Sequence, residues 1–156
     1  MLGAAVGTMQ LAGPTLQNPP SQDDHALEAD QAVPAGIAKL LERSCMDCHS
    51  NRTHWTWYSH IAPIGWYMQY HVEEGRKKMN FSEWSSRRDS AGRVIHSVND
   101  LEAVCDSVSK GNMPFRSYTL LHRSAVLSQD EKNAICDWTD KVVAERHSPP
   151  PSGDTK

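Results

Sequence analysis

The sequence has no excess of charge of either sign and no long apolar run. Sixteen Lys and Arg residues against 19 Asp and Glu residues leave a formal net charge of −3 at pH 7, which does not indicate a nucleic-acid-binding protein. The apolar stretch MLGAAVGTMQLAG is too short to span a bilayer, and no later stretch approaches a transmembrane helix. With 38% hydrophobic residues over 156 positions, the chain is expected to form one soluble globular domain.

The alternation of apolar and polar residues that signals a β-strand is also missing. No run is long enough to predict a strand, and no internal repeat is present. The expected fold is therefore mostly α-helical. Apolar residues at helical spacing predict three helices, over about Pro34–Cys48, about Asn99–Lys110 and a segment that begins at Ser128. A further helix, second in chain order, is expected over about Pro63–Arg76, because Pro63 suits a first turn and Gly75 can end the helix.

Local signals place the ends of these helices. Ser128 and Glu131 match a capping box at the start of the last helix. Gly75 and Gly111 are expected to end the second and third helices, because glycine readily takes the backbone conformation that follows a last helical turn.

Composition divides the chain into three parts. Residues 1–36 contain Gly, Pro, Gln and Ser with little periodicity, and are predicted to be an extended N-terminal arm or linker rather than core. Residues 37–146 are the expected folded domain, and residues 147–156 are a flexible Pro-rich tail. The first 13 residues resemble the later part of a secretory signal, so we expect the remnant of a signal or a membrane anchor there.

The motif with the most specific chemistry is C-x-x-C-H at Cys45, Cys48 and His49, which is the attachment motif of c-type haem. Two thiols three positions apart can bond to the two vinyl groups on one edge of a porphyrin. The next residue then lies beneath the iron as its proximal ligand. The expected cofactor is one covalently bound haem c.

Two other kinds of site use similar cysteines. A thioredoxin-like redox pair needs a preceding strand and a βαβ context, and the sequence predicts neither. A zinc site needs additional ligands, and Cys105 and Cys136 are single cysteines rather than a second pair. The motif favours haem over both alternatives.

The second axial ligand of the iron must come from another part of the chain, and Met or His usually supplies it. Met113 is favoured because it lies in a Gly-Asn-Met-Pro loop between two predicted helices, where Pro114 restricts the backbone. A histidine ligand and an open sixth position remain alternatives. The other candidates are Met68, Met79, His54, His60, His71, His96 and His122, of which His122 competes best because it lies close to the same loop.

Cys105 and Cys136 remain once the haem takes its pair. Both fall on apolar stripes of predicted helices, so the two helices can face each other with these cysteines in contact. A disulfide between them would span 31 residues and add roughly 3.5 kcal/mol of stability on the chain-entropy estimate. Two buried free thiols are the alternative.

Arg76 and Arg87 are candidates to pair with a haem propionate.

A long segment of the chain resembles the bacterial haem-binding domain family of monohaem c-type proteins: CMDCHSNRTHWTWYSHIAPIGWYMQYHVEEGRKKMNFSEW. It contains the family's Cys-x-x-Cys-His-Ser-Asn, Trp-Tyr-Ser, Ala-Pro-x-x-Trp and Asn-Phe-Ser-x-Trp steps. The later GNMPFRSYTLLHRSAVLSQDEKNAICDWTD matches the family's Met-Pro, Tyr, His, Leu-Ser and Trp pattern. The likeness extends from about Asn18 to Lys141. One departure is Thr56, where the family often has Pro.

The resemblance implies a cytochrome-c-like helical domain around one haem, exported and often tethered to the membrane by its N-terminus. It supports Cys45, Cys48 and His49 as haem residues and favours Met113 as the distal ligand.

We therefore expect a monohaem c-type protein, not an enzyme, that shuttles single electrons between redox partner proteins in the periplasm or another extracytoplasmic space. Thioether attachment and a disulfide both fit such a compartment. One alternative is a haem-based peroxidase or gas sensor with an open or displaceable sixth ligand. Another is a fixed cytochrome subunit of a larger respiratory or photosynthetic complex.

Overall fold

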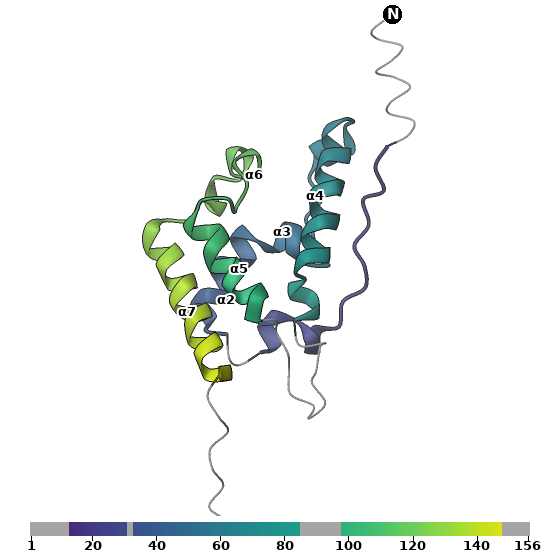
Figure 1. Cartoon of the computed structure of the whole chain (residues 1–156). Coiled ribbons are helices and arrows are strands. Elements are labelled where there is room, and N and C mark those ends of the chain that lie inside the picture. Colours follow the sequence, from purple (N-terminus) through teal and green to yellow (C-terminus); the bar gives the residue numbers. More distant parts are fainter. Residues whose placement is uncertain (1–12, 31–32, 85–97, 148–156) are drawn as a thin grey trace, which may run out of the picture.

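The computed structural model describes residues 13–30, 33–84 and 98–147. These residues form helices joined by turns, with no β-strand among them, as the sequence predicted (Figure 1). The α-helices are α2 (Ala35–Ser44), α3 (Met46–His49), α4 (Ile64–Lys78), α5 (Val98–Ser109), α6 (Arg116–Leu121) and α7 (Gln129–His147). The short 3-10 helices are η1 (Asp23–His25), η2 (Leu27–Ala29), η3 (Trp57–His60), η4 (Phe81–Glu83) and η5 (Arg123–Ala125).

α4 lies on one side of the molecule, and α5 and α7 lie together on the other, with α3 between the two sides (Figure 1). The core is a cluster of buried apolar side chains from α2, α5, α7 and the segments that connect them. Its members are Leu27, Ile37, Leu41, Met46, Phe81, Trp84, Leu101, Val104, Val108, Leu127, Ile135 and Trp138. Because Met46 belongs to α3, the core anchors the predicted haem-attachment segment to the long C-terminal helices.

The predicted helices are present, with three differences. The first is interrupted at Cys45, whose backbone (φ −130°, ψ −36°) separates α2 from α3. The second continues through Gly75 to Lys78, so the expectation that Gly75 ends it is wrong. The short helix α6 was not predicted. Among the described residues, no helix combines the length and hydrophobicity needed to cross a bilayer.

The capping box of α7 is confirmed. The Ser128 backbone N–H donates to Glu131 Oε2 at 2.8 Å, and the Glu131 N–H donates to Ser128 Oγ at 3.3 Å. Arg43 of α2 also donates to the Glu131 carboxylate, at 2.8 Å. The Ser128 backbone bond and the Arg43 contact both lower the pKa of Glu131, so the cap stays ionised and links α7 to α2.

α5 and α7 are joined covalently. Cys105 and Cys136 form the disulfide that their places on the two helical stripes predicted. Because α5 ends just before the loop that contains Met113, the bridge ties the base of that loop to the longest helix of the domain.

The prediction that residues 1–36 lie outside the core is wrong for the segment around η2. Leu27 is fully buried and Ala26 is buried. Trp84 Nε1 donates to the Asp30 carboxylate at 2.9 Å, and Glu28 pairs with Arg52. Single turns of 3-10 helix are too short to show apolar periodicity, which is why the sequence did not reveal this packing. Residues 13–22 run alongside α4 (Figure 1).

We predict that Leu27→Ala lowers the free energy of unfolding by about 2–4 kcal/mol, because it removes a fully buried side chain and leaves a cavity. Urea unfolding followed by circular dichroism measures this. Gln22→Ala, at an exposed position five residues earlier, is the matched control and should change the stability by less than about 0.5 kcal/mol. Equal, small effects of both variants would mean that the segment is a linker after all.

Candidate functional site

One cavity of about 550 Å³ is lined by all four residues that the sequence predicts to hold haem, Cys45, Cys48, His49 and Met113. α3 and α4 supply one side of it, and α5, the following loop and α6 supply the other. The volume lies within the range of about 300–1,000 Å³ that is usual for ligand and cofactor pockets. The fold therefore brings Met113 to the same cavity as the C-x-x-C-H motif, although 64 residues separate it from His49.

The cysteine side of the cavity depends on close packing of α3 against α4. A Cβ atom at Gly75 would overlap the carbonyl oxygen of Cys48. Gly75 is thus required inside α4 for contact with α3, not as a helix terminator. The one sequence signal for this role was a glycine within a predicted helix, which often marks a close packing contact.

His49 is oriented by a backbone carbonyl. Its Nδ1 lies 3.2 Å from the carbonyl oxygen of Met79. A carbonyl can only accept, so Nδ1 is protonated and Nε2 has a free lone pair, as a metal-ligating histidine requires. Burial lowers the pKa of His49, so the ring is neutral at pH 7. The Phe81 ring packs against it edge-on, with centroids 6.3 Å apart.

The two motif thiols are not joined to each other in the structure. Burial, with a smaller contribution from Cys48, raises the pKa of the Cys45 thiol to about 12. Burial and the adjacent Asp47 raise the pKa of the Cys48 thiol to about 11. A redox-active dithiol needs a lowered pKa, so this environment disfavours the thioredoxin-like alternative.

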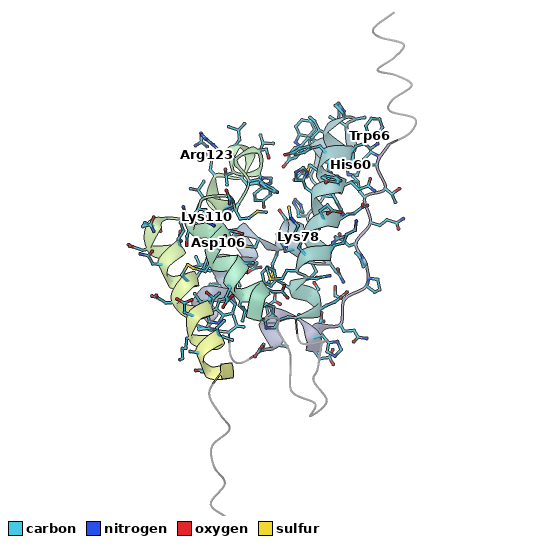
Figure 2. The ribbon with its side chains drawn as sticks, viewed as in Figure 1. His60, Trp66, Lys78, Asp106, Lys110 and Arg123 are labelled. Carbon is cyan, nitrogen blue, oxygen red and sulfur yellow. A yellow bond between two sulfur atoms is a disulfide. The ribbon has the colours of Figure 1, made fainter. Side chains whose placement is uncertain are left out.

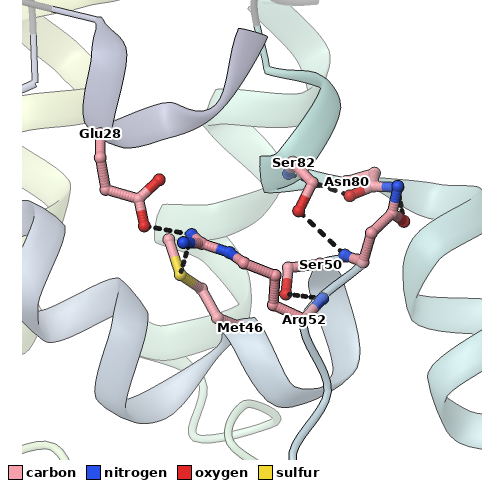
Figure 3. Close-up of polar contacts among 7 residues, drawn as sticks. Glu28, Met46, Ser50, Arg52, Asn80 and Ser82 are labelled. Carbon is pink, nitrogen blue, oxygen red and sulfur yellow. Dashed lines mark hydrogen bonds and ion pairs between the residues drawn. The ribbon is translucent and has the colours of Figure 1, made fainter. Parts of the chain in front are cut away.

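The loop that follows His49 is held by a buried polar network (Figure 3). The Asn51 backbone N–H donates to Ser82 Oγ at 2.9 Å, and Asn80 Nδ2 donates to Asn51 Oδ1 at 2.7 Å. The Ser82 N–H in turn donates to Asn80 Oδ1 at 3.0 Å. The His-Ser-Asn and Asn-Phe-Ser motifs noted in the sequence are thus hydrogen-bonded to each other, and these bonds fix the backbone that follows α3.

Arg76 is not available to a haem propionate, although the sequence suggested that role. Its guanidinium donates to the Ser50 carbonyl at 2.7 Å, to Thr53 Oγ1 at 2.8 Å and to Asn18 Oδ1 at 2.8 Å. These bonds tie α4 to the loop after α3 and to the N-terminal arm. The other candidate, Arg87, lies outside the described residues.

Of the described Lys and Arg residues, Lys78 alone lines the cavity. It lies on the side of α4 that faces α5 (Figure 2) and is exposed. Its neighbour Lys77 already pairs with Glu74 at 2.8 Å, whereas no ion pair engages Lys78 within the described chain. The Lys78 ammonium group could therefore pair with an anionic group of a cofactor bound in the cavity.

The loop that contains Met113 is shaped by the end of α5. Gly111 takes a positive φ of 70°, the Gly111 N–H donates to the Val108 carbonyl, and the Asn112 N–H donates to the Ser107 carbonyl. These two bonds are those of a Schellman motif. The Met113 N–H also donates to the Ser107 carbonyl, at 3.2 Å. Gly111 therefore ends α5 as predicted and turns the chain so that Met113 lines the cavity.

The other candidate axial ligands are distributed differently. Met79 and His71 also line the cavity, but Met79 packs partly against the core and His71 lies on α4. Met68, His54 and His122 line a second, adjacent cavity of about 160 Å³. His60 lines neither cavity, and His96 lies outside the described residues.

His122, the strongest histidine competitor in the sequence, has both ring nitrogens occupied. Nδ1 lies 3.1 Å from the Tyr118 carbonyl and must donate to it, so Nε2 accepts from Tyr58 O–H, at 3.1 Å. His71 likewise donates from Nδ1 to the Tyr67 carbonyl at 2.8 Å, which leaves its Nε2 free. Among the candidate histidines in the described chain, His71 is therefore the alternative to Met113.

A hydrogen bond between α3 and α6 joins the two sides of the cavity. Tyr118 O–H donates to Asp47 Oδ2 at 2.6 Å, and the backbone N–H of His54 donates to Asp47 Oδ1 at 3.0 Å. Burial and the bond to Asp47 raise the pKa of Tyr118 far above its usual range, so it remains a donor. Tyr118 is the Tyr of the family pattern noted above, but the sequence did not indicate Asp47 as its partner, because Asp47 is one of the two variable positions of C-x-x-C-H.

The residues of this cavity fit a c-type haem better than zinc. The described lining of the cavity includes the two thiols, two histidines with a free Nε2 (His49 and His71), two methionines (Met79 and Met113) and the cation of Lys78. The additional zinc ligands that the sequence offered, Cys105 and Cys136, are bonded to each other. Within the described residues, no group of three or more His, Cys, Asp and Glu side chains is placed to hold a metal ion.

A comparison with family models agrees with this site. The model of a family described as a haem-binding domain matches residues 4–141, which is most of the chain and includes both sides of the cavity. No curated protein and no solved structure matches the chain significantly.

We predict that Gly75→Ala disrupts the contact between α3 and α4. The new methyl group would overlap the Cys48 carbonyl, so the variant should lose about 1–3 kcal/mol of stability and bind less haem. Gly36→Ala is the matched control, since a Cβ there meets nothing within 4 Å. It should be neutral or slightly stabilising because alanine favours the helix. Normal haem binding in Gly75→Ala would show that the contact is dispensable.

We also predict that Tyr118→Phe loosens α6. Loss of the bond to the Asp47 carboxylate should cost about 1–2 kcal/mol and increase amide hydrogen exchange in α6. Tyr70→Phe removes an exposed hydroxyl from the same cavity lining and serves as the control, with no change expected in α6. If exchange in α6 is the same in both variants, the bond does not hold the helix.

Proposed function

Since this chain belongs to the haem-binding domain family, we propose that it is a monohaem c-type electron-transfer protein that passes single electrons between extracytoplasmic redox partners. The family match makes it a haem protein. The observation that best supports the finer assignment is that Cys45, Cys48, His49 and Met113 line one cavity. The iron of a bound haem would supply the one-electron chemistry.

In this proposal Cys45 and Cys48 bond to the two vinyl groups, and His49 is the proximal ligand. The pairing of α3 with α4 holds both cysteines and the histidine on one side of the cavity. The hydrogen bond from His49 Nδ1 to the Met79 carbonyl sets the tautomer and the ring orientation in advance. Such a partner raises the basicity of a ligating nitrogen and limits reorganisation when the oxidation state changes.

Met113 is the proposed distal ligand. It comes from the loop after α5 and so from the other side of the cavity than His49. The Schellman turn at Gly111 and the disulfide at Cys105 restrain this loop at its base. A thioether ligand favours the ferrous state and raises the reduction potential, which suits a carrier that accepts and releases one electron.

The rival function is a haem enzyme or sensor with an open or displaceable sixth position. The adjacent cavity of about 160 Å³ favours it to some degree, because a small molecule there would share Asp47, Cys48 and Tyr118 with the main cavity. An occupied sixth position makes such ligands compete with a protein side chain. We therefore propose a carrier rather than an enzyme.

The proposed location is the periplasm or another extracytoplasmic space, and the N-terminal arm is the candidate membrane tether. Thioether attachment takes place outside the cytoplasm, and the Cys105–Cys136 disulfide persists under oxidising conditions. We propose that the physiological partners are other redox proteins, either free or within a larger respiratory or photosynthetic complex.

We predict that the ferric holoprotein is low-spin with a sulfur-to-iron absorption band, and that Met113→Ala abolishes this band and lowers the reduction potential. His71→Ala is the matched control because His71 lines the same cavity and has a free Nε2. It should keep both the band and the potential.

Three outcomes would contradict parts of this assignment. Loss of the low-spin spectrum in His71→Ala would make His71 the ligand. A high-spin spectrum of the unaltered protein that changes with cyanide or carbon monoxide would support the rival function. Release of the haem on denaturation would exclude covalent attachment.

A further inference from the structure

Acidic residues are absent from two long segments of a chain that is acidic overall. Residues 48–72 and residues 107–129 contain no Asp or Glu, although the chain has 19. The two segments contain Arg52, Lys110, Arg116 and Arg123, a formal charge of +4. Since the whole chain has a charge of −3, the remaining residues together hold −7. The charge is therefore unevenly distributed along the sequence.

The same two segments contain the exposed apolar surface. Of the described residues, nine large hydrophobic side chains are exposed, five of them in residues 48–72 and four in residues 107–129. The most exposed are Trp57 (76%), Leu120 (69%), Leu121 (61%) and Tyr70 (61%). Single exposed hydrophobic residues are ordinary, but a set confined to the acid-free segments indicates an interaction surface.

The two segments meet in space beside the haem cavity. Tyr67 O–H and Ser117 Oγ lie 3.1 Å apart, and the rings of His71 and Phe115 pack edge-on with centroids 5.2 Å apart. The cavity of about 160 Å³ lies between them. In Figure 2, His60 and Trp66 are labelled residues of the first segment, and Arg123 is a labelled residue of the second.

Aromatic rings connect this surface to the haem cavity. Exposed Trp57 packs edge-on against Tyr58 at 5.7 Å, and Tyr58 is hydrogen-bonded to His122. His122 stacks on Tyr118 at 4.1 Å, and Tyr118 lines the haem cavity. A partner seated over Trp57 would thus lie at the outer end of a continuous set of rings that leads to the haem site.

Two of the four basic residues are free to meet a partner. Arg52 pairs with Glu28, and Lys110 pairs with Asp106 at 2.7 Å. Arg116 and Arg123 are exposed and form no ion pair with a described residue. They begin α6 and η5, so they flank exposed Leu120 and Leu121 in the chain.

We propose that the exposed apolar side chains of residues 48–72 and 107–129, together with Arg116 and Arg123, form a face that docks an electron-transfer protein with an apolar centre and an acidic rim. The proposal rests on the electron-transfer function and adds the chemistry of the partner. Charge complementarity selects the acidic rim, and the apolar side chains supply the buried centre that such interfaces require.

Two other occupants fit the observations less well. A membrane surface calls for clusters of about 4–8 basic residues or a long amphipathic helix, whereas α6 has six residues and two arginines are free. A second copy related by a twofold axis would place the two basic faces against each other, which like charge opposes.

The test measures electron transfer from the ferrous holoprotein to an acidic and a basic blue-copper protein by stopped flow. Salt is varied between about 10 mM and about 1 M, where the Debye length falls from about 30 Å to about 3 Å. The rate constant with the acidic protein should fall at least about tenfold as salt rises. Arg116→Glu with Arg123→Glu should remove most of that low-salt rate.

Matched variants distinguish an effect of the proposed face from an effect of the net charge of the protein. Lys39→Glu with Lys141→Glu makes the same change of charge at exposed positions outside the two segments, and should change the rate less than about twofold. Leu120→Ser with Leu121→Ser should lower the rate at low and high salt alike. If the lysine pair reduces the rate as much as the arginine pair, net charge governs the reaction and the proposed face is wrong.

Binding is measured separately so that two failures can be told apart. A zinc-substituted, redox-inert form of the acidic protein is titrated while backbone amide shifts are recorded. Shifts confined to residues 48–72 and 107–129 support the face even if no electrons move, in which case the electron-transfer function fails. If electrons are transferred but the amide shifts lie outside these residues, the proposed docking face is wrong and the electron-transfer function still stands. Co-sedimentation with anionic phospholipid vesicles, or self-association that Arg116→Glu with Arg123→Glu abolishes, also overturns it.

Discussion

The contact between α3 and α4 is the constraint on which the rest of the site depends. α3 is a single helical turn and cannot hold a geometry alone. It is positioned because Gly75 lets α4 approach the Cys48 carbonyl, and because the carbonyl at the end of α4 accepts from His49. The polar network at Asn51 then fixes the chain as it leaves α3. The packing contact at Gly75 and these hydrogen bonds restrain α3 from different directions.

The other side of the cavity is built by different means. The position of the loop with Met113 depends on the turn at Gly111, the disulfide at Cys105 and the bond from Tyr118 to Asp47. An iron–sulfur bond is a weak one, and a restrained loop loses little conformational entropy when that bond forms. The arrangement therefore suits a methionine ligand better than a flexible loop would.

The distribution of charge and apolar surface connects the site to its proposed use. Residues 48–72 and 107–129 contain no acidic residue, and among the described residues they contain the large exposed hydrophobic side chains and rings beside the haem cavity. A partner attracted to this face would be guided to the part of the surface nearest the cavity. The same asymmetry would discourage association through two identical faces.

The sequence by itself determined the features that depend on neighbours within a few positions. The C-x-x-C-H spacing, the capping box at Ser128 and the glycine turn after α5 are such features, because a single helical turn or a short loop contains all their interacting groups. The mostly helical fold follows from the same local periodicities.

Only the tertiary structure decided the rest, because those features depend on contacts between residues far apart in the chain. The burial of Leu27, the role of Gly75 inside α4 and the engagement of Arg76 with the arm are contacts of this kind. Periodicity says which face of a helix is apolar, but it does not say what packs against that face. For that reason the sequence could propose Met113 as a partner of His49, while the fold was needed to bring both to one cavity.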